Sequence, residues 1–170
     1  MTPTDTPTPT TVPISVYMIT FNNDRTVEKA LQSVADWADE IVVVDSFSTD
    51  STPDIIKKYT DNLQQRQWPG FRDQYQFAAE RCNNDWVMFI DADEEISPAL
   101  AKEIQAELAA NATRPDDQKI AAYQCHRRTW FLGRWIMHGG WVPDHEIRLY
   151  DKQKGQWKGG AVGAKMVVGA

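Results

Sequence analysis

The sequence predicts an α/β fold, built on an open and mostly parallel sheet with helices on both faces. Short apolar runs, several of which end in a polar residue, have the length and β-branched composition of buried strands. Between them lie segments whose apolar residues recur at helical spacing. Because this alternation continues from residue 14 to residue 108, right-handed crossovers between parallel strands are the expected connections.

Four segments are expected to form strands: residues 14–19, 41–44, 63–68 and 86–90. The run 41–44 is apolar at every position, as in a parallel strand that is covered on both faces. A turn-forming stretch, Asn22 to Asp24, follows the first strand, while Asp45 and Asp91 directly follow the second and the last. The strand ends are therefore polar.

Four helices are expected between and after these strands: residues 25–35, 53–59, 71–82 and 97–108. Asn23 or Asp24 is the expected N-cap of the first helix, and Pro53 suits the first turn of the second. Ser97 and Pro98 form a good N-cap and first residue for the last helix. From residue 120 onward the pattern is aromatic and Gly-rich, which predicts a mixed or antiparallel C-terminal extension.

Length and composition favour one domain, residues 14–170, preceded by a disordered Thr- and Pro-rich tail, residues 1–13. The net charge of -6 argues against nucleic acid as a partner, because that affinity rests on Lys and Arg. Cys82 and Cys125 lack CxxC spacing, and no secretory signal or stretch of roughly 20 apolar residues is present. We therefore expect a cytoplasmic protein whose contact with the inner membrane is at most peripheral.

Polar side chains follow each of three predicted strands, and the carboxyl ends of parallel strands meet at one edge of a sheet. These residues are Thr20, Asn22, Asp45, Ser48, Asp91 and Asp93. The DAD sequence after a buried strand favours a divalent cation, Mg²⁺ or Mn²⁺, held by Asp91 and Asp93 together with phosphate oxygens. The alternatives are a solvated Asp turn at DAD and an Asx turn at Asp45.

Four segments, in order and spacing, resemble the inverting glycosyltransferases of family 2, which have the GT-A fold: ISVYMITFNND, EIVVVDSFSTDST, DWVMFIDADEEIS and HGGWVPDHEIRLY. More narrowly, they look like the bacterial β-glucosyltransferase-like group of lipopolysaccharide or lipooligosaccharide core assembly. The similarity extends from residue 14 to about residue 168.

The resemblance implies a UDP-sugar donor, carrying glucose or another hexose, and a glycan or glycolipid acceptor. It places Asp45 near the uracil, Asp91 and Ala92 near the ribose or metal, and Asp93 on the cation. Asp144 is the implied base that removes the acceptor proton, with Glu146 as its substitute. Arg148 would balance the diphosphate charge, and Arg72 is the only cation near the position where relatives carry a basic residue.

The chain also departs from the family pattern. Gly163 and Ala164 stand where relatives often read His-Glu, and the sequence stops before the usual remainder, so a shortened domain is expected. One alternative is therefore an inactive nucleotide-sugar-binding remnant or a partner subunit. A second is a phosphatase of the haloacid dehalogenase type, whose nucleophile would be Asp91. Several aromatic residues are candidates for stacking on an acceptor sugar, although core positions are commoner for this type: Trp130, Phe131, Trp135, Trp141 and Trp157.

Overall fold

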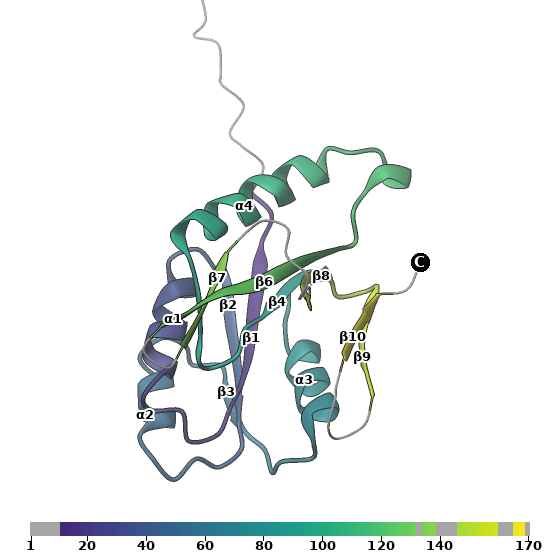
Figure 1. The fold of residues 1–170 in the computed structure, drawn as a ribbon. Coiled ribbons are helices and arrows are strands. Elements are labelled where there is room, and N and C mark those ends of the chain that lie inside the picture. The colour runs from purple at the N-terminus through teal and green to yellow at the C-terminus, as the bar shows by residue number, and fades with distance from the viewer. Residues whose placement is uncertain (1–10, 132–133, 139–145, 160–164, 169–170) are drawn as a thin grey trace, which may run out of the picture.

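The computed structural model describes residues 11–131, 134–138, 146–159 and 165–168 (Figure 1). The helices are α1 (Val27–Ala35), α2 (Thr52–Ile56), α3 (Phe71–Glu80) and α4 (Pro98–Ala112), with a short 3-10 helix, η1 (Asp116–Gln118). The strands are β1 (Ile14–Thr20), β2 (Glu40–Asp45), β3 (Leu63–Gln65), β4 (Trp86–Phe89), β5 (Glu94–Ile96), β6 (Ala122–Phe131), β7 (Arg134–His138), β8 (Glu146–Asp151), β9 (Gly155–Lys158) and β10 (Lys165–Val168).

The N-terminal half forms the parallel part of the sheet, in the order β3-β2-β1-β4. Every residue of β1 from Ser15 to Thr20 has a partner in β2, and Thr20 lies opposite Asp45 at the end of both strands. On its other side β1 pairs in parallel with β4, where Tyr17 lies opposite Phe89. The carboxyl ends of the three strands therefore meet at one edge, as the sequence predicts.

The C-terminal half extends the same sheet with mixed pairing. β8 is antiparallel to β4, and β6 is antiparallel to β8 through its first residues and to β7 through its last. β5 lies at the far edge, parallel to β7. β9 and β10 form a separate hairpin. The predicted mixed extension is confirmed.

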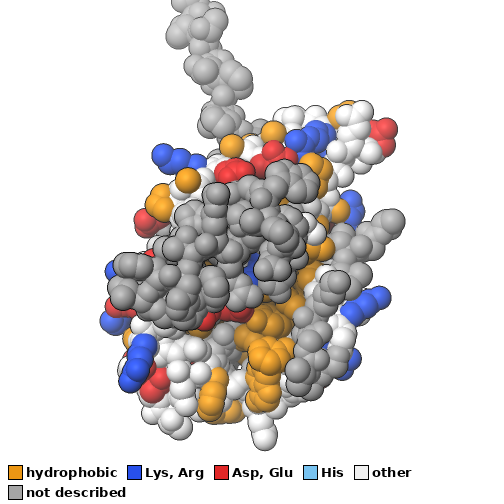
Figure 2. Space-filling model, viewed as in Figure 1, with side chains coloured by type: hydrophobic (Ala, Val, Ile, Leu, Met, Phe, Trp, Pro, Cys, Tyr) orange, Lys and Arg blue, Asp and Glu red, His pale blue; other side chains and the backbone are white. Residues whose placement is uncertain are grey.

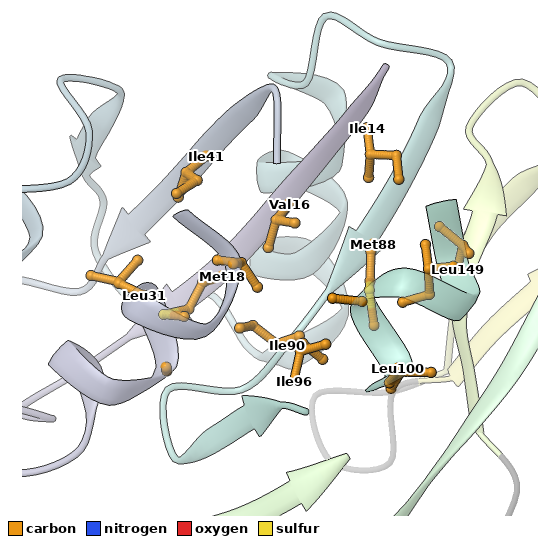
Figure 3. Close-up of a cluster of buried hydrophobic side chains, with 14 of the residues drawn as sticks. Ile14, Val16, Met18, Leu31, Ile41, Met88, Ile90, Ile96, Leu100 and Leu149 are labelled. Carbon is orange, nitrogen blue, oxygen red and sulfur yellow. The ribbon is translucent and has the colours of Figure 1, made fainter. Parts of the chain in front are cut away.

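One face of the sheet is covered by α1, α2 and α4. Side chains from β1, β2 and β4 pack there against Leu31 of α1 and Leu100 of α4 (Figure 3). Ile56 of α2 belongs to the same cluster. Leu31 and Ile56 are fully buried. Each such side chain contributes about 1.5–3 kcal/mol through removal of its apolar surface from water, so this face supplies much of the driving force for folding.

The opposite face is covered by α3 and the β9–β10 hairpin. Tyr75 and Ala78 of α3 pack on the sheet together with Cys82, which follows the end of that helix, and Trp157 of β9 lies beside them. The indole Nε1–H of Trp157 donates to the hydroxyl of Tyr17 over 2.9 Å. Helices therefore lie on both faces, as expected for this class, and the hairpin completes the second layer.

The start of α1 differs from the prediction. α1 begins only at Val27, because neither Asn23 nor Asp24 caps it: the N-cap residue is Thr26, without a side-chain cap bond. The backbone carbonyl of Asn23, and not its side chain, accepts from the amide of Val27 over 2.9 Å. The N-cap of α4 is as predicted, since the Ser97 hydroxyl accepts from the amide of Leu100 over 3.1 Å.

Cys82 and Cys125 are both buried free thiols. Within the ranges that the structure describes, no helix has the length and apolar character needed to cross a bilayer.

Candidate functional site

A cavity of about 630 Å³ opens at the carboxyl edge of the parallel strands. Its described lining consists of Ile19, Thr20, Phe21, Asn23, Ser46, Trp68, Phe71, Tyr75, Asp91, Ala92 and Asp93. Figure 2 shows hydrophobic side chains gathered in the lower part of the molecule, toward the end at which β1 finishes in Figure 1. In open α/β sheets ligands bind at this edge, so the cavity is the candidate site.

The wall and the floor of the cavity differ in chemistry. Phe21, Trp68 and Phe71 are large apolar side chains that stay well exposed, by 58%, 45% and 43%. Trp68 and Phe71 meet edge to face, with ring centroids 4.7 Å apart. Exposed aromatic rings of this kind mark ligand surfaces more often than isolated apolar residues do.

The floor is acidic and comes from the DAD sequence after β4. Asp91, Ala92 and Asp93 all line the cavity, and Ala92 is buried. The hydroxyl of Tyr75 donates to Oδ1 of Asp91 over 2.6 Å. Burial, followed by the neighbouring Asp91 carboxylate, raises the pKa of Tyr75 well above its usual value, so the hydroxyl stays protonated and can act as this donor.

A buried ion pair lies behind the acidic floor. Arg148 of β8 and Glu94 of β5 are almost completely buried and form a two-pronged salt bridge, in which Nη2 donates to Oε2 over 3.0 Å. Glu94 Oε1 also accepts from the backbone amide of Asp91 over 2.7 Å. Burial raises the pKa of Glu94, and the facing guanidinium opposes that shift. The pair thus fixes the backbone at the start of the DAD sequence.

Arg148, which the resemblance implies would balance the diphosphate charge, does not line the cavity. Its side chain is 1% exposed, its guanidinium lies over the ring of Phe89 at 4.5 Å, and Nη2 is 4.0 Å from Oδ2 of Asp91. The sequence could not show this, because Glu94, which accepts from both Nη1 and Nη2 of Arg148, is 54 residues away. Arg148 therefore acts on the site through Glu94 and Asp91.

Asp45 also lies behind the cavity wall and not in it. Its carboxylate is fully buried. It accepts from the Thr20 hydroxyl over 2.6 Å, from the Ser48 hydroxyl over 2.6 Å and from the Ser48 amide over 2.8 Å. Thr20 and the neighbouring Ser46 line the cavity in its place. The Ser48 amide lies three residues after Asp45, so the bond resembles the Asx-turn alternative, in which the amide is two residues on.

Asn22 and Ser48 join the loops that follow β1 and β2. The amide of Asn22 donates to the Ser48 hydroxyl over 2.7 Å, and the Asn22 side chain accepts from the amide of Thr49 over 2.8 Å. Asn22 has a positive φ of 52°, which Asn tolerates better than most residues. Both residues thus shape the rim, while the next residue, Asn23, lines the cavity.

Arg72 faces a different hollow. This smaller depression, of about 290 Å³, lies between α3 and β9. Arg72 donates to the carboxylate of Asp73 over 3.0 Å and to the carbonyl of Gly159 over 2.9 Å. The helix turn that carries Arg72 points it away from the acidic floor, so the structure does not bring this residue to the candidate site.

The two predicted acid–base residues cannot be placed as side chains. Asp144 lies outside the described residues, and only the backbone of Glu146 is described, at the start of β8. Of the aromatic residues considered for acceptor stacking, Trp157 is a core residue that is 3% exposed.

Sequence reasoning missed Tyr75 as a site residue. Its spacing from Phe71 and Ala78 indicates only a buried helix face, and Tyr75 does pack there. The available signal was the spacing of two aromatic residues, Phe71 and Tyr75, which are four positions apart and so share one helix face; their rings are 6.2 Å apart.

The donor set suits a hard divalent cation bound together with phosphate. Asp91 and Asp93 provide two carboxylates at one cavity. In the part of the chain that the structure describes, no group of three or more His, Cys, Asp or Glu could hold a metal ion. Mg²⁺ typically binds through one or two carboxylates plus substrate phosphates and water, so this limited set fits that mode.

Comparison with known proteins identifies the family. The model of glycosyl transferase family 2 matches residues 15–168. An "uncharacterized glycosyltransferase" of Rickettsia typhi is 39% identical over 140 residues, which are 82% of this chain and 47% of that protein. The lipopolysaccharide core biosynthesis glycosyltransferase LpsC of Rhizobium meliloti is 31% identical over 156 residues, 86% of this chain and 53% of LpsC. The chain thus spans about half the length of these relatives.

Solved structures agree on the fold. Residues 1–349 of TarS from S. aureus superimpose with a TM-score of 0.52 at 24% identity, over 72% of this chain and 43% of that one. The complex of the same fragment with UDP-GlcNAc gives a TM-score of 0.51 at 25% identity, over 69% of this chain and 40% of that one. The fold is GT-A. The family match excludes the alternative of a phosphatase of the haloacid dehalogenase type. The chain belongs to glycosyl transferase family 2.

Proposed function

We propose that this protein transfers a hexose from a UDP-sugar to a glycan or glycolipid acceptor, with inversion and with the help of a divalent cation. Two similarities support this function: LpsC is named for lipopolysaccharide core biosynthesis, and the TarS fragment was solved with UDP-GlcNAc. The proposed setting is cell-envelope biosynthesis, where a glycolipid acceptor would bring the enzyme to the cytoplasmic face of the membrane.

The observation on which the proposal rests is the two-sided cavity. The exposed rings of Trp68 and Phe71 offer flat apolar surface to a uracil base, while Asp91 and Asp93 lie on the floor. The described lining contains no Lys or Arg. Because a diphosphate is itself anionic, it can approach two carboxylates only if a cation lies between them. Thr20 and Ser46 supply hydroxyls for the ribose side.

Asp91 and Asp93 would hold the cation, which when bound stabilises the charge that develops on the departing nucleoside diphosphate. Asp45, through its three hydrogen bonds, keeps Thr20 and the loop after β2 in place. In this proposal Asp45 organises the nucleotide side of the cavity. Because Ser48 donates two hydrogen bonds to the buried Asp45 carboxylate, Asp45 can touch the uracil only if Ser48 moves away.

The acceptor side needs a base, and Asp144 or Glu146 is proposed for this role. β8 runs antiparallel to β4, with Leu149 opposite Met88. The start of β8, at Glu146, therefore lies at the same edge of the sheet as the carboxyl end of β4, which leads to Asp91. A carboxylate at this edge would take the proton from the acceptor hydroxyl as that oxygen attacks the sugar, and a single displacement inverts the anomeric centre.

The function is tested by measuring nucleotide release from UDP-glucose, UDP-galactose and GDP-mannose, with Mn²⁺ or with EDTA, and with or without a lipopolysaccharide core acceptor. We expect release from a UDP-sugar that needs Mn²⁺ and increases with acceptor, and a product of inverted configuration by NMR. Asp144→Asn or Glu146→Gln should lower kcat by about 10²–10⁴ and leave the Kd of UDP unchanged. Binding of UDP without any hydrolysis or transfer would contradict the proposal and favour the inactive remnant.

A further inference from the structure

The hydrogen bond from Tyr75 to Asp91 lies at the site, and the proposed function gives it no role. At 2.6 Å it is short, and it joins a neutral donor to a carboxylate. Such charge-assisted bonds are about twice as strong as neutral ones. Because Tyr75 occupies Oδ1, the carboxylate of Asp91 is held in one orientation while its side chain stays 33% exposed to the cavity.

Tyr75 is itself held rigidly from outside the cavity. Its ring stacks on the indole of Trp157, with centroids 4.3 Å apart and planes inclined by 11°. It also lies against Phe89, the residue that ends β4, at 5.3 Å. Trp157 is fixed in turn, since its amide donates to the Gln76 side chain over 3.0 Å and its indole donates to Tyr17 over 2.9 Å.

The other side of Asp91 is fixed by the sheet. The Glu94 carboxylate accepts from the amide of Asp91 over 2.7 Å, and the guanidinium of Arg148 lies 4.0 Å from Oδ2. The backbone is therefore set by β5 and β8, but among the described residues only the Tyr75 hydroxyl lies within hydrogen-bond distance of the carboxylate oxygens.

On the basis of the proposed function, we infer that Tyr75 is a positioning residue: its hydroxyl aims the Asp91 carboxylate at the cation and diphosphate, and the β9 strand holds Tyr75 in place through Trp157. The consequence is that β9 contributes to donor binding although none of the described residues of the hairpin lines the cavity. Cation affinity then depends on a neutral hydroxyl from α3.

The test is Tyr75→Phe, which keeps the ring that stacks on Trp157 and removes only the hydroxyl. The readout is the enhancement of UDP binding by Mn²⁺, measured by calorimetry as the ratio of the Kd of UDP without and with saturating Mn²⁺. We expect Tyr75→Phe to reduce this enhancement about ten-fold and to leave the Kd of UDP without Mn²⁺ within two-fold of wild type. A variant that merely loosened the fold would weaken UDP binding in both conditions.

Tyr59→Phe is the matched control. The Tyr59 hydroxyl also donates to a carboxylate, that of Glu28, over 3.0 Å, but it lies on the α1–α2 side and does not line the cavity. This variant should keep the full enhancement. Circular dichroism and thermal unfolding of both variants verify that each is folded.

Three outcomes are informative. A reduced enhancement in Tyr75→Phe alone supports the inference. An unchanged or larger enhancement in Tyr75→Phe, with a normal wild type, overturns the inference and leaves the proposed function standing. A wild type whose UDP binding does not respond to Mn²⁺ overturns the proposed cation dependence, and the inference falls with it.

Discussion

Arg148 and Glu94 form a two-pronged salt bridge that is sealed from solvent, with both side chains at most 1% exposed. Their strands, β8 and β5, are separated in the sheet by β6 and β7. The pair thus links two distant parts of the sheet directly behind Asp91, whose amide bonds to Glu94. The acidic floor of the cavity is built on this contact.

Breaking this pair should be costly for stability. Arg148→Met leaves the Glu94 carboxylate buried without its main counter-charge, and such uncompensated charges cost about 3–5 kcal/mol. We expect a loss of that size in the free energy of unfolding, measured by urea denaturation. Arg114→Met is the control, because the Arg114–Glu107 pair is about one third exposed and should contribute much less to stability than the buried pair. Equal losses of unfolding free energy in the two variants would show that the buried pair stabilises the fold no more than the exposed pair does.

The aromatic wall makes a separate prediction for nucleotide binding. Stacking of a base on an aromatic side chain is worth about 1–3 kcal/mol, so Phe71→Ala should raise the Kd of UDP by roughly ten-fold or more. Phe47→Ala is the control, since Phe47 is 57% exposed but does not line the cavity. Fluorescence or calorimetric titration with UDP distinguishes the two variants. A similar affinity in both would place the base elsewhere.

The raised pKa of the buried Cys82 thiol predicts how the free energy of unfolding changes at alkaline pH. Burial, with a smaller effect of Glu40, raises the pKa of its thiol from about 9.0 to about 12. The unfolded chain therefore releases this proton first as pH rises. The contribution of the protonated Cys82 thiol to the free energy of unfolding is fully present below pH 9. It is lost between pH 9 and 12, at about 1.4 kcal/mol per pH unit.

The measurement is the free energy of unfolding at pH 8, 9.5 and 10.5 for the wild type and Cys82→Ala. The wild type should lose stability more steeply with pH, because the variant lacks this proton. Parallel pH curves would mean that the thiol is not protected in the folded state. Cys125 is present in both proteins and does not affect the comparison.

The parallel half of the fold follows from sequence because its signals are local. Runs such as 41–44 are apolar at every position, and each ends where a polar loop begins. β5 could not be predicted in the same way, since Glu94–Ile96 is a three-residue strand that forms only by pairing with β7 about 40 residues later. The start of α1 was misplaced because a side-chain cap was assumed where a backbone carbonyl acts instead.

The residues of the candidate site also differ in whether local sequence predicts them. The rule that ligands bind at the carboxyl edge gathers Thr20, Asp91 and Asp93, and the structure brings these residues to one cavity. Which cations and hydroxyls face that cavity depends on non-local packing. Arg148 turns to Glu94, and Tyr75 reaches Asp91 from α3, although nothing in the neighbouring residues of either one indicates the partner.

The central claim, a cation that joins Asp91 and Asp93 to the diphosphate, is tested most directly by calorimetry of UDP with and without Mn²⁺ for the wild type, Asp93→Asn and Asp61→Asn. Asp61 is exposed and lies away from the cavity. Mn²⁺ should strengthen UDP binding at least about ten-fold in the wild type and in Asp61→Asn, and should have almost no effect in Asp93→Asn, because the substitution removes a ligand charge but little volume. An equal Mn²⁺ effect in all three proteins would contradict the account.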